Sequence, residues 1–331
     1  MKVAVLGAGA WGSALSLPLG DNGHQIALWC RRRQQAQALN QSGRNDLYLP
    51  DITLGFEKAT TDLEEALKGA QLVFITVPSK AVRSLCSQAR PHLSPEAVVV
   101  STAKALERGS AKRMSEVIGE ELALAPHRVT ALSGPNFAVE VSRRLPTATV
   151  IGGEKEATHR VQQALMTGHL RVYTNVDLAG VELGGALKNV MALAVGIAEG
   201  MGLGLNAQAA IITRGLAEVS RLGTRLGAST ETFMGLSGMG DLVLTCTGHY
   251  SRNRQAGIAI GQGNTLMEFI RETKKVVEGM YTTEVAWELA QKLAVDMPIT
   301  QQVHRILFEG YPVKESLASI MQRTGKDEWA F

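Results

Sequence analysis

The chain has 331 residues, of which 45% are hydrophobic and 20% charged, a composition typical of a globular protein with room for two domains. Its 34 basic and 31 acidic residues leave a formal net charge of +3. That charge is too small to indicate a nucleic-acid surface, although it suits anionic metabolites.

The cysteines and histidines argue against a disulfide-stabilised protein and against a metalloprotein. Cys30, Cys86 and Cys246 are far apart and odd in number, so they predict neither a disulfide framework nor a zinc site. The seven histidines form no HxH or HExxH pattern. No uninterrupted apolar stretch reaches membrane-spanning length. We expect a cytoplasmic protein without a bound metal or an integral membrane segment.

The first half of the chain alternates between strand-like and helix-like segments. Short, largely apolar runs predict strands at 2–7, 24–29, 72–77, 97–101, 128–132, 147–151 and 170–173. Helical segments are predicted between most of them, for example at 62–68, 79–90 and 111–124. This alternation predicts an α/β domain over residues 1–176, with a doubly wound, covered parallel sheet.

A glycine-rich turn follows the first predicted strand. Gly7, Gly9 and Gly12 form the pattern G-x-G-x-x-G directly before a helix. In a dinucleotide site the first glycine allows the tight turn, the second lets the backbone approach a pyrophosphate, and the third allows close helix packing. The alternative is a turn without a ligand, but the strand–turn–helix context favours a Rossmann-type nucleotide site.

A basic segment follows the second predicted strand, which ends at Trp29. NAD-selective sites usually carry an acidic residue here to hold the ribose 2′-hydroxyl. This chain has Arg31, Arg32 and Arg33 instead, and a guanidinium binds phosphate oxygens in pairs. A solvated basic turn is the alternative. The segment predicts NADPH as the preferred cofactor and NADH as a second one.

The strand signal disappears after about residue 177. Helical composition over 181–200, 206–226, 252–262 and 282–294 predicts an all-helical second domain over residues 177–331. Glycine-rich loops are expected between these helices, as at 235–242.

Lys188 is the only ionisable residue in the apolar run 183–198. Burial of an ammonium group costs free energy unless something compensates for its lost hydration. The lysine therefore favours a functional site at this position. The alternative is a lysine whose stem packs on the helix while its head reaches water.

Three further stretches carry chemistry. Lys104 follows a predicted strand, at the sheet edge where ligands bind; it could equally be a solvated loop lysine. Asp241 is expected in the loop of GLSGMGDL, or as a helix cap. Ser251, Arg252 and Asn253 suit a phosphate monoester, or an ordinary helix start. Their joint occurrence favours a site.

In combination, these stretches resemble the soluble, bacterial-type NAD(P)-dependent glycerol-3-phosphate dehydrogenases. The resemblance covers nearly the full chain and includes GAGAWG (7–12), KALE (104–107), LSGPNFAVEV (132–141), GGALKNV (184–190), TRGLAE (213–218), GLSGMGDL (235–242), TCTGHYSRNR (245–254) and VVEG (276–279). It implies a Rossmann domain followed by a helical domain. It also implies an oxidoreductase (EC 1.1.1.94) that interconverts dihydroxyacetone phosphate and sn-glycerol 3-phosphate with NAD(P)H and feeds glycerophospholipid synthesis, and it allows a homodimer.

The resemblance also implies roles for individual residues. Lys188 would be the catalytic proton donor and acceptor, Lys104 a catalytic lysine that reaches cofactor and substrate, and Asp241 the acid beside the reacting hydroxyl. The substrate phosphate would contact Ser251, Arg252 and Asn253, with Arg252 also near the cofactor. The other implied positions are Trp11, Arg31, Arg32, Ala138, Val276 and Glu278 for the cofactor and Gly134 and Asn136 for the substrate.

The chain departs from the family pattern at a few positions. Ala105 stands where a glycine is common, Asn136 where a small hydroxyl residue is common, and an acid and a lysine are missing near Leu205 and Gln208. These departures bear on local loop geometry and affinity.

Two other functions share parts of this pattern. β-Hydroxyacid dehydrogenases share the G-x-x-x-K spacing of Gly184 and Lys188, but they place an asparagine four residues after the lysine, where this chain has Ala192. A non-enzymatic NADPH sensor would not need Lys104, Lys188 and Asp241 together.

Overall fold

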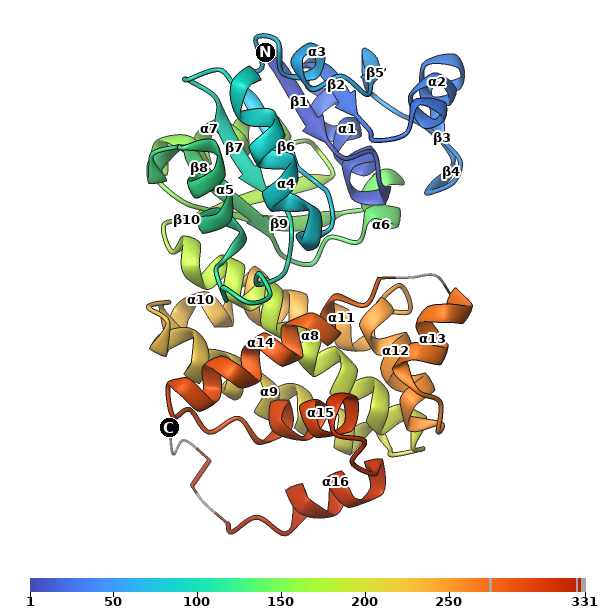
Figure 1. Ribbon diagram of the computed structural model, residues 1–331, viewed down its shortest axis with the longest axis vertical. Helices are drawn as coiled ribbons and strands as arrows, with labels where there is room; N and C mark the ends of the chain where they lie inside the picture. Colours follow the sequence, from blue (N-terminus) through green and yellow to red (C-terminus); the bar gives the residue numbers. More distant parts are fainter. Residues whose placement is uncertain (274–275, 326, 329–331) are drawn as a thin grey trace. The chain divides into compact units, whose positions relative to one another are not determined.

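The computed structural model describes residues 1–273, 276–325 and 327–328. The chain forms two compact units (Figure 1). The first comprises Met1–Glu107 and Lys112–Glu182, and the second Arg108–Ala111 and Leu183–Phe331. The boundary predicted at residues 176 and 177 falls just before helix α8 (Leu178–Gly200), whereas the compact units divide inside that helix.

An eight-stranded sheet in the order β10-β9-β8-β7-β6-β1-β2-β5 organises the first unit. Its strands are β1 Lys2–Leu6, β2 Gln25–Trp29, β5 Lys58–Thr60, β6 Leu72–Ile75, β7 Val98–Ser101, β8 Val129–Ser133, β9 Thr147–Gly152 and β10 Leu170–Asn175. A separate hairpin pairs β3 (Arg44–Asn45) with β4 (Leu49–Thr53).

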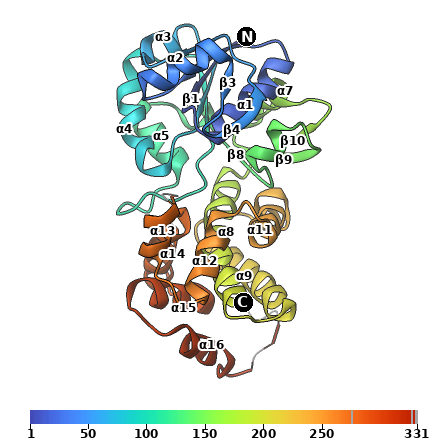
Figure 2. The same cartoon turned by 90° about the vertical axis from the view of Figure 1, so that its right-hand side faces the viewer.

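Helices cover both faces of this sheet (Figure 2). They are α1 Ala10–Asp21, α2 Arg33–Ser42, α3 Leu63–Leu67, α4 Ser79–Ala89, α5 Met114–Leu122, α6 Ala138–Ser142 and α7 Lys155–Leu165, with short 3₁₀ turns at Arg90–His92 and Pro126–Arg128. Because successive strand side chains point to opposite faces, Val3 and Val5 join a core with α1 and α7. Ala4 and Leu6 join a second core with α4 and α5. The doubly wound Rossmann-type domain is confirmed.

Three details of the predicted sheet were wrong. β8 and β9 pair antiparallel, while the other strand pairs of the sheet are parallel. Composition does not encode pairing direction, since an apolar run of five residues suits either ladder. β5 and the β3–β4 hairpin were not predicted, because they have only two to five residues each and lack a clear alternating pattern.

The second unit is helical over its described residues, as predicted. After α8 it contains α9 Leu205–Arg225, α10 Thr230–Met234, α11 Asp241–Thr247, α12 Arg252–Gly261, α13 Leu266–Thr273, α14 Glu278–Lys292, α15 Pro298–Phe308 and α16 Val313–Met321. The stretch predicted as a loop at 235–242 is instead a π-helical turn, Leu236–Gly240, that leads directly into α11. Its glycines serve packing, because a Cβ on Gly238 would lie 2.0 Å from the Phe233 carbonyl oxygen.

Helix α8 is the apolar centre of this unit. Its 23 residues are long and apolar enough to cross a membrane by length and composition, but the apolar window is entirely buried within the fold. Helix α8 is longer than the apolar run 183–198 of the sequence, which is too short to cross a membrane. Glycines let its backbone contact its neighbours directly, since a Cβ on Gly196 or Gly200 would collide with α12. Its burial is that of a core helix.

Candidate functional site

The glycine turn between β1 and α1 has the geometry of a dinucleotide site. Gly7 has φ +130°, a conformation that favours glycine. A Cβ on Gly12 would lie 1.9 Å from the Gly7 carbonyl oxygen, so only glycine fits at this helix position. A Cβ on Gly9 would meet nothing within 4 Å. The turn therefore leaves open space at the N-terminus of α1, where a pyrophosphate would bind.

The basic segment follows β2 directly. Arg32 is the N-cap of α2 and Arg33 its first residue, and the side chains of all three arginines are exposed. Exposed guanidinium groups beyond the second strand suit a ribose 2′-phosphate. Two other predicted cofactor residues, Trp11 and Ala138, are half-buried and pack against the core that supports the turn.

Lys104 is brought together with two other predicted residues at the carboxyl edge of the sheet. Its ammonium group donates to the Gly134 carbonyl oxygen and to Asn136 Oδ1, both at 2.8 Å. The Asn136 amide in turn donates to Thr149 Oγ1 at 2.9 Å. Asn136 thus holds the lysine in place. The neighbouring Ala105 is buried.

Lys188 and Asp241 form a buried ion pair in the second unit. Lys188 on α8 is 5% exposed and Asp241 1% exposed, and the ammonium group donates to Asp241 Oδ1. It also donates to Thr245 Oγ1 at 2.7 Å. The alternative of a lysine head that reaches water was wrong. Asp241 lies in the first turn of α11 rather than in a loop.

Thr245 was not predicted as part of this group. It lies one turn after Asp241 on α11, and its hydroxyl donates to the Asp241 backbone oxygen at 2.6 Å. The hydroxyl proton is thereby committed, so the Thr245 oxygen faces the lysine as an acceptor. The i, i+4 spacing within DLVLT was the available signal. The next residue offers no nucleophile, since burial raises the pKa of the Cys246 thiol to about 12.

The run 251–253 forms the start of α12. Ser251 is the N-cap, and its hydroxyl accepts from the Arg254 amide at 3.2 Å. Arg252 is exposed. Asn253 is buried and donates to Asn189 Oδ1 at 2.8 Å, while its own oxygen accepts from the Gly279 amide at 3.0 Å. Ser251 and Asn253 thus cap and join helices in this structure.

The remaining predicted positions lie near the ends of helices in the second unit. Val276 and Glu278 are half-buried at the start of α14, next to the Gly279 amide that Asn253 accepts from. Leu205 is largely exposed at the first position of α9, and Gln208 is half-buried one turn later.

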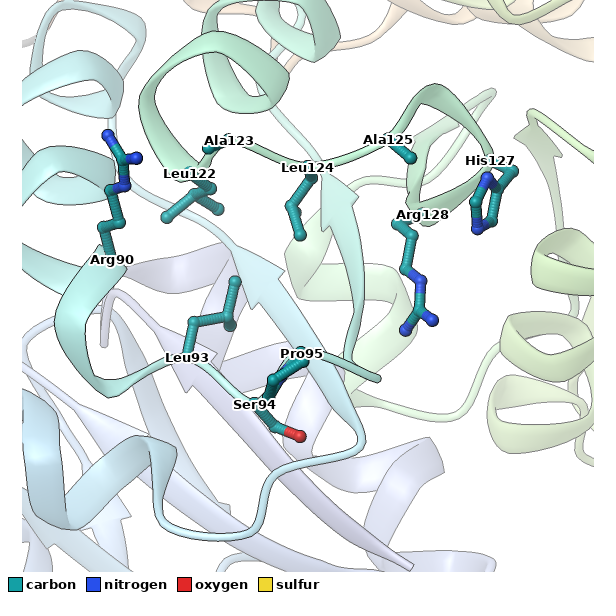
Figure 3. A pocket seen from close by; sticks show the side chains of 10 residues that line it. All are labelled: Arg90, Leu93, Ser94, Pro95, Leu122, Ala123, Leu124, Ala125, His127 and Arg128. Atoms are coloured by element: carbon teal, nitrogen blue, oxygen red, sulfur yellow. The ribbon is translucent and has the colours of Figure 1, made fainter.

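A cavity of about 340 Å³ lies elsewhere in the first unit (Figure 3). Leu93, Leu122 and Leu124 contribute its apolar lining, and Arg90 and Arg128 its charges. It lies beside the segments that lead into β7 and β8, at the amino edge of the sheet. The glycine turn and Lys104 lie at the carboxyl edge, so the cavity contains none of the predicted site residues.

A glycine turn with the geometry of a dinucleotide site on a Rossmann-type sheet, joined to a helical unit with a buried lysine–aspartate pair, is typical of NAD(P)-dependent oxidoreductases. Residues 2–159 match the family model for the N-terminus of NAD-dependent glycerol-3-phosphate dehydrogenase, and residues 177–318 match the model for its C-terminus. The chain therefore belongs to the NAD-dependent glycerol-3-phosphate dehydrogenase family.

Individual relatives agree over the full length. The chain is 48% identical over 333 residues to glycerol-3-phosphate dehydrogenase [NAD(P)+] of Carboxydothermus hydrogenoformans, covering 100% of this chain and 99% of the relative. It is 49% identical to the enzyme of the same name from Moorella thermoacetica, covering 97% and 96%. The crystal structure of glycerol-3-phosphate dehydrogenase from Coxiella burnetii superposes with a TM-score of 0.91 at 39% identity, covering 97% and 99%. The resemblance noted from the motifs is confirmed.

Proposed function

We propose that this protein catalyses the reduction of dihydroxyacetone phosphate to sn-glycerol 3-phosphate with NADPH, and the reverse reaction. The name of its full-length relatives, glycerol-3-phosphate dehydrogenase [NAD(P)+], supports this reaction. Within the chain, the buried group of Lys188, Asp241 and Thr245 carries the proposal, because reduction of a ketone needs a proton donor positioned beside the carbonyl oxygen. The product would feed glycerophospholipid synthesis.

Most of the residues proposed to bind the cofactor belong to the first unit. Gly7, Gly9 and Gly12 would receive the pyrophosphate at the N-terminus of α1. Arg31 and Arg32 would contact the 2′-phosphate, which makes NADPH the preferred cofactor and NADH the second. When bound, the nicotinamide supplies the hydride for the ketone carbon. Other contacts are proposed for Trp11, Lys104, Ala138, Arg252, Val276 and Glu278.

Lys188 would complete the reduction. As hydride reaches C2, negative charge develops on the carbonyl oxygen, and the ammonium group donates its proton to that oxygen. Asp241 stabilises the charged lysine before transfer, and Thr245 orients it. The neutral lysine then recovers a proton from solvent. In oxidation the same amine accepts the hydroxyl proton.

The substrate would be held at its polar groups. Arg252 is exposed and offers a bidentate donor to the phosphate. Ser251 and Asn253 would assist, and one amide hydrogen of Asn253 remains beyond its bond to Asn189. Lys104, Gly134 and Asn136 form a second polar group, proposed to contact the substrate from the first unit.

Three further proposals concern the roles of the domains, the location of the protein and its oligomeric state. Residues 1–176 would form the cofactor domain and residues 177–331 the substrate domain. The protein would function in the cytoplasm without integral membrane association, and as a homodimer. Size-exclusion chromatography with light scattering tests the oligomeric state.

A steady-state assay with purified protein tests the function. We expect NADPH oxidation that depends on dihydroxyacetone phosphate, with far lower kcat/KM for dihydroxyacetone. A sensor would bind NADPH without turnover. Binding with no oxidation at saturating substrate would therefore overturn the proposed function.

A further inference from the structure

The carbonyl group of Ala8, in the middle of the glycine turn, is held by two side chains. Gln35 on α2 donates its amide to the Ala8 oxygen at 2.6 Å. Asn45 on β3 donates to the same oxygen at 3.1 Å. A carbonyl oxygen has two lone pairs, so these two amides satisfy its full acceptor capacity.

The direction of this carbonyl determines the direction of a neighbouring donor. The peptide between Ala8 and Gly9 is trans, and a trans peptide points its C=O and N–H to opposite sides. With the Ala8 oxygen fixed toward α2 and β3, the Gly9 N–H points the other way. Gly9 is the N-cap of α1, where a Cβ would meet nothing within 4 Å. The N–H therefore belongs to the turn that would receive the pyrophosphate.

Each of the two side chains makes a further hydrogen bond that fixes its position. Asn45 is 5% exposed, and its amide also donates to the buried Ser13 Oγ at 2.7 Å, which joins the hairpin to the first turns of α1. Gln35 is half-buried, and its oxygen accepts from Arg32 at 3.4 Å. Helix α2, which begins at Arg33, is thus connected to the glycine turn.

We propose that Gln35 and Asn45 are positioning residues for the cofactor: by holding the Ala8 carbonyl, they aim the Gly9 N–H at the pyrophosphate. The inference rests on the proposed function, because it takes the ligand of this turn to be NADPH. Neither side chain needs to touch the cofactor. The loss of either should weaken ligands that contain a pyrophosphate and spare ligands that lack one.

The experiment compares variants by calorimetric titration with two ligands. NADPH contains the pyrophosphate, whereas adenosine 2′-monophosphate carries only the 2′-phosphate and the base. Gln35→Met keeps the length of the side chain but removes both amide donors. Gln34→Met, at the exposed neighbouring position of α2, is the matched control. Asn45→Ala removes the second hydrogen bond to the Ala8 oxygen.

We expect Gln35→Met to raise the Kd of NADPH about three- to tenfold, the loss of one hydrogen bond. The Kd of adenosine 2′-monophosphate, kcat and the KM for dihydroxyacetone phosphate should stay within twofold of wild type. Gln34→Met should change none of these. Asn45→Ala should repeat the pattern; if it fails to fold, Gln35→Met alone decides.

Two results would overturn the inference. One is an unchanged Kd for NADPH in Gln35→Met. The other is an equal loss for both ligands, which would place the effect at Arg32 rather than at the turn. Wild-type protein that fails to bind NADPH would instead contradict the proposed function, and with it this inference.

Discussion

Replacing Lys188 with methionine removes a cation from a position that is 5% exposed, beside a carboxylate that is 1% exposed. The Asp241 carboxylate then lies buried without its charged partner. Breaking a buried pair in this way costs about 3–5 kcal/mol. Adding Asp241→Asn removes the stranded charge, so the double variant should recover at least about 2 kcal/mol of the lost stability.

Activity should respond differently from stability. Methionine cannot donate a proton, so kcat should fall about 10²–10⁴-fold in Lys188→Met. The double variant should regain stability without regaining kcat. NADPH affinity should remain, because the proposed nucleotide turn is in the first unit.

Urea unfolding followed by circular dichroism measures the stability of both variants, and initial rates with dihydroxyacetone phosphate measure kcat. Both variants lose the hydrogen bond from Lys188 to Thr245 and the ion pair with Asp241. The difference in stability between them therefore measures the cost of the buried, unpaired carboxylate. A loss of less than about 1 kcal/mol in the free energy of unfolding of Lys188→Met, the range of an exposed pair, would contradict a stabilising buried ion pair. A kcat within a few-fold of wild type would contradict the role of Lys188 as proton donor.

Three other predictions concern the cofactor, the phosphate and pH. Wild-type protein should show higher kcat/KM with NADPH than with NADH, and Arg31→Ala should reduce that preference; equal wild-type efficiency with both cofactors would contradict the role of the arginines. Arg252→Ala should lose about thirtyfold or more in kcat/KM for dihydroxyacetone phosphate, from a loss of about 2–5 kcal/mol; near-normal kinetics would place the phosphate elsewhere. Burial raises the pKa of Glu218 from 4.5 to about 7, against opposing hydrogen bonds from Ile299 and Thr300. The folded state therefore retains a proton that the unfolded state loses, and stability should fall between pH 4.5 and 7 by up to about 3 kcal/mol relative to Glu218→Gln. Parallel urea-unfolding profiles of the two proteins across this range would refute the last prediction.

The sequence predicted the architecture because its periodic signals are strong. The strand–turn–helix at Gly7 and the helical run around Lys188 both have a composition that permits few other structures. Pairing direction and very short strands were missed, since the antiparallel β8–β9 pair and β5 depend on tertiary contacts. The π-helical turn before Asp241 was read as a loop, because glycines required for close packing and glycines required for turns look alike in a sequence.

The site was predictable only as far as charge and motif allowed. Lys188 stands out because an ammonium group in an apolar run demands a partner. Thr245 does not stand out, since its part in the group depends on a hydroxyl proton committed to the Asp241 backbone oxygen. The sequence likewise gave no signal for Gln35 and Asn45, because the Ala8 carbonyl that they hold lies 27 and 37 residues away along the chain.

Transfer of deuterium from the cofactor to the product shows directly whether the protein moves hydride to C2 of dihydroxyacetone phosphate. The enzyme is incubated with dihydroxyacetone phosphate and NADPH that carries deuterium at both C4 positions of the nicotinamide, and the product is analysed by mass spectrometry and NMR. We expect sn-glycerol 3-phosphate with a single deuterium at C2, formed by wild type and about 10²–10⁴-fold more slowly by Lys188→Met. Product without deuterium at C2, or no product from protein that binds NADPH, would contradict the proposed function.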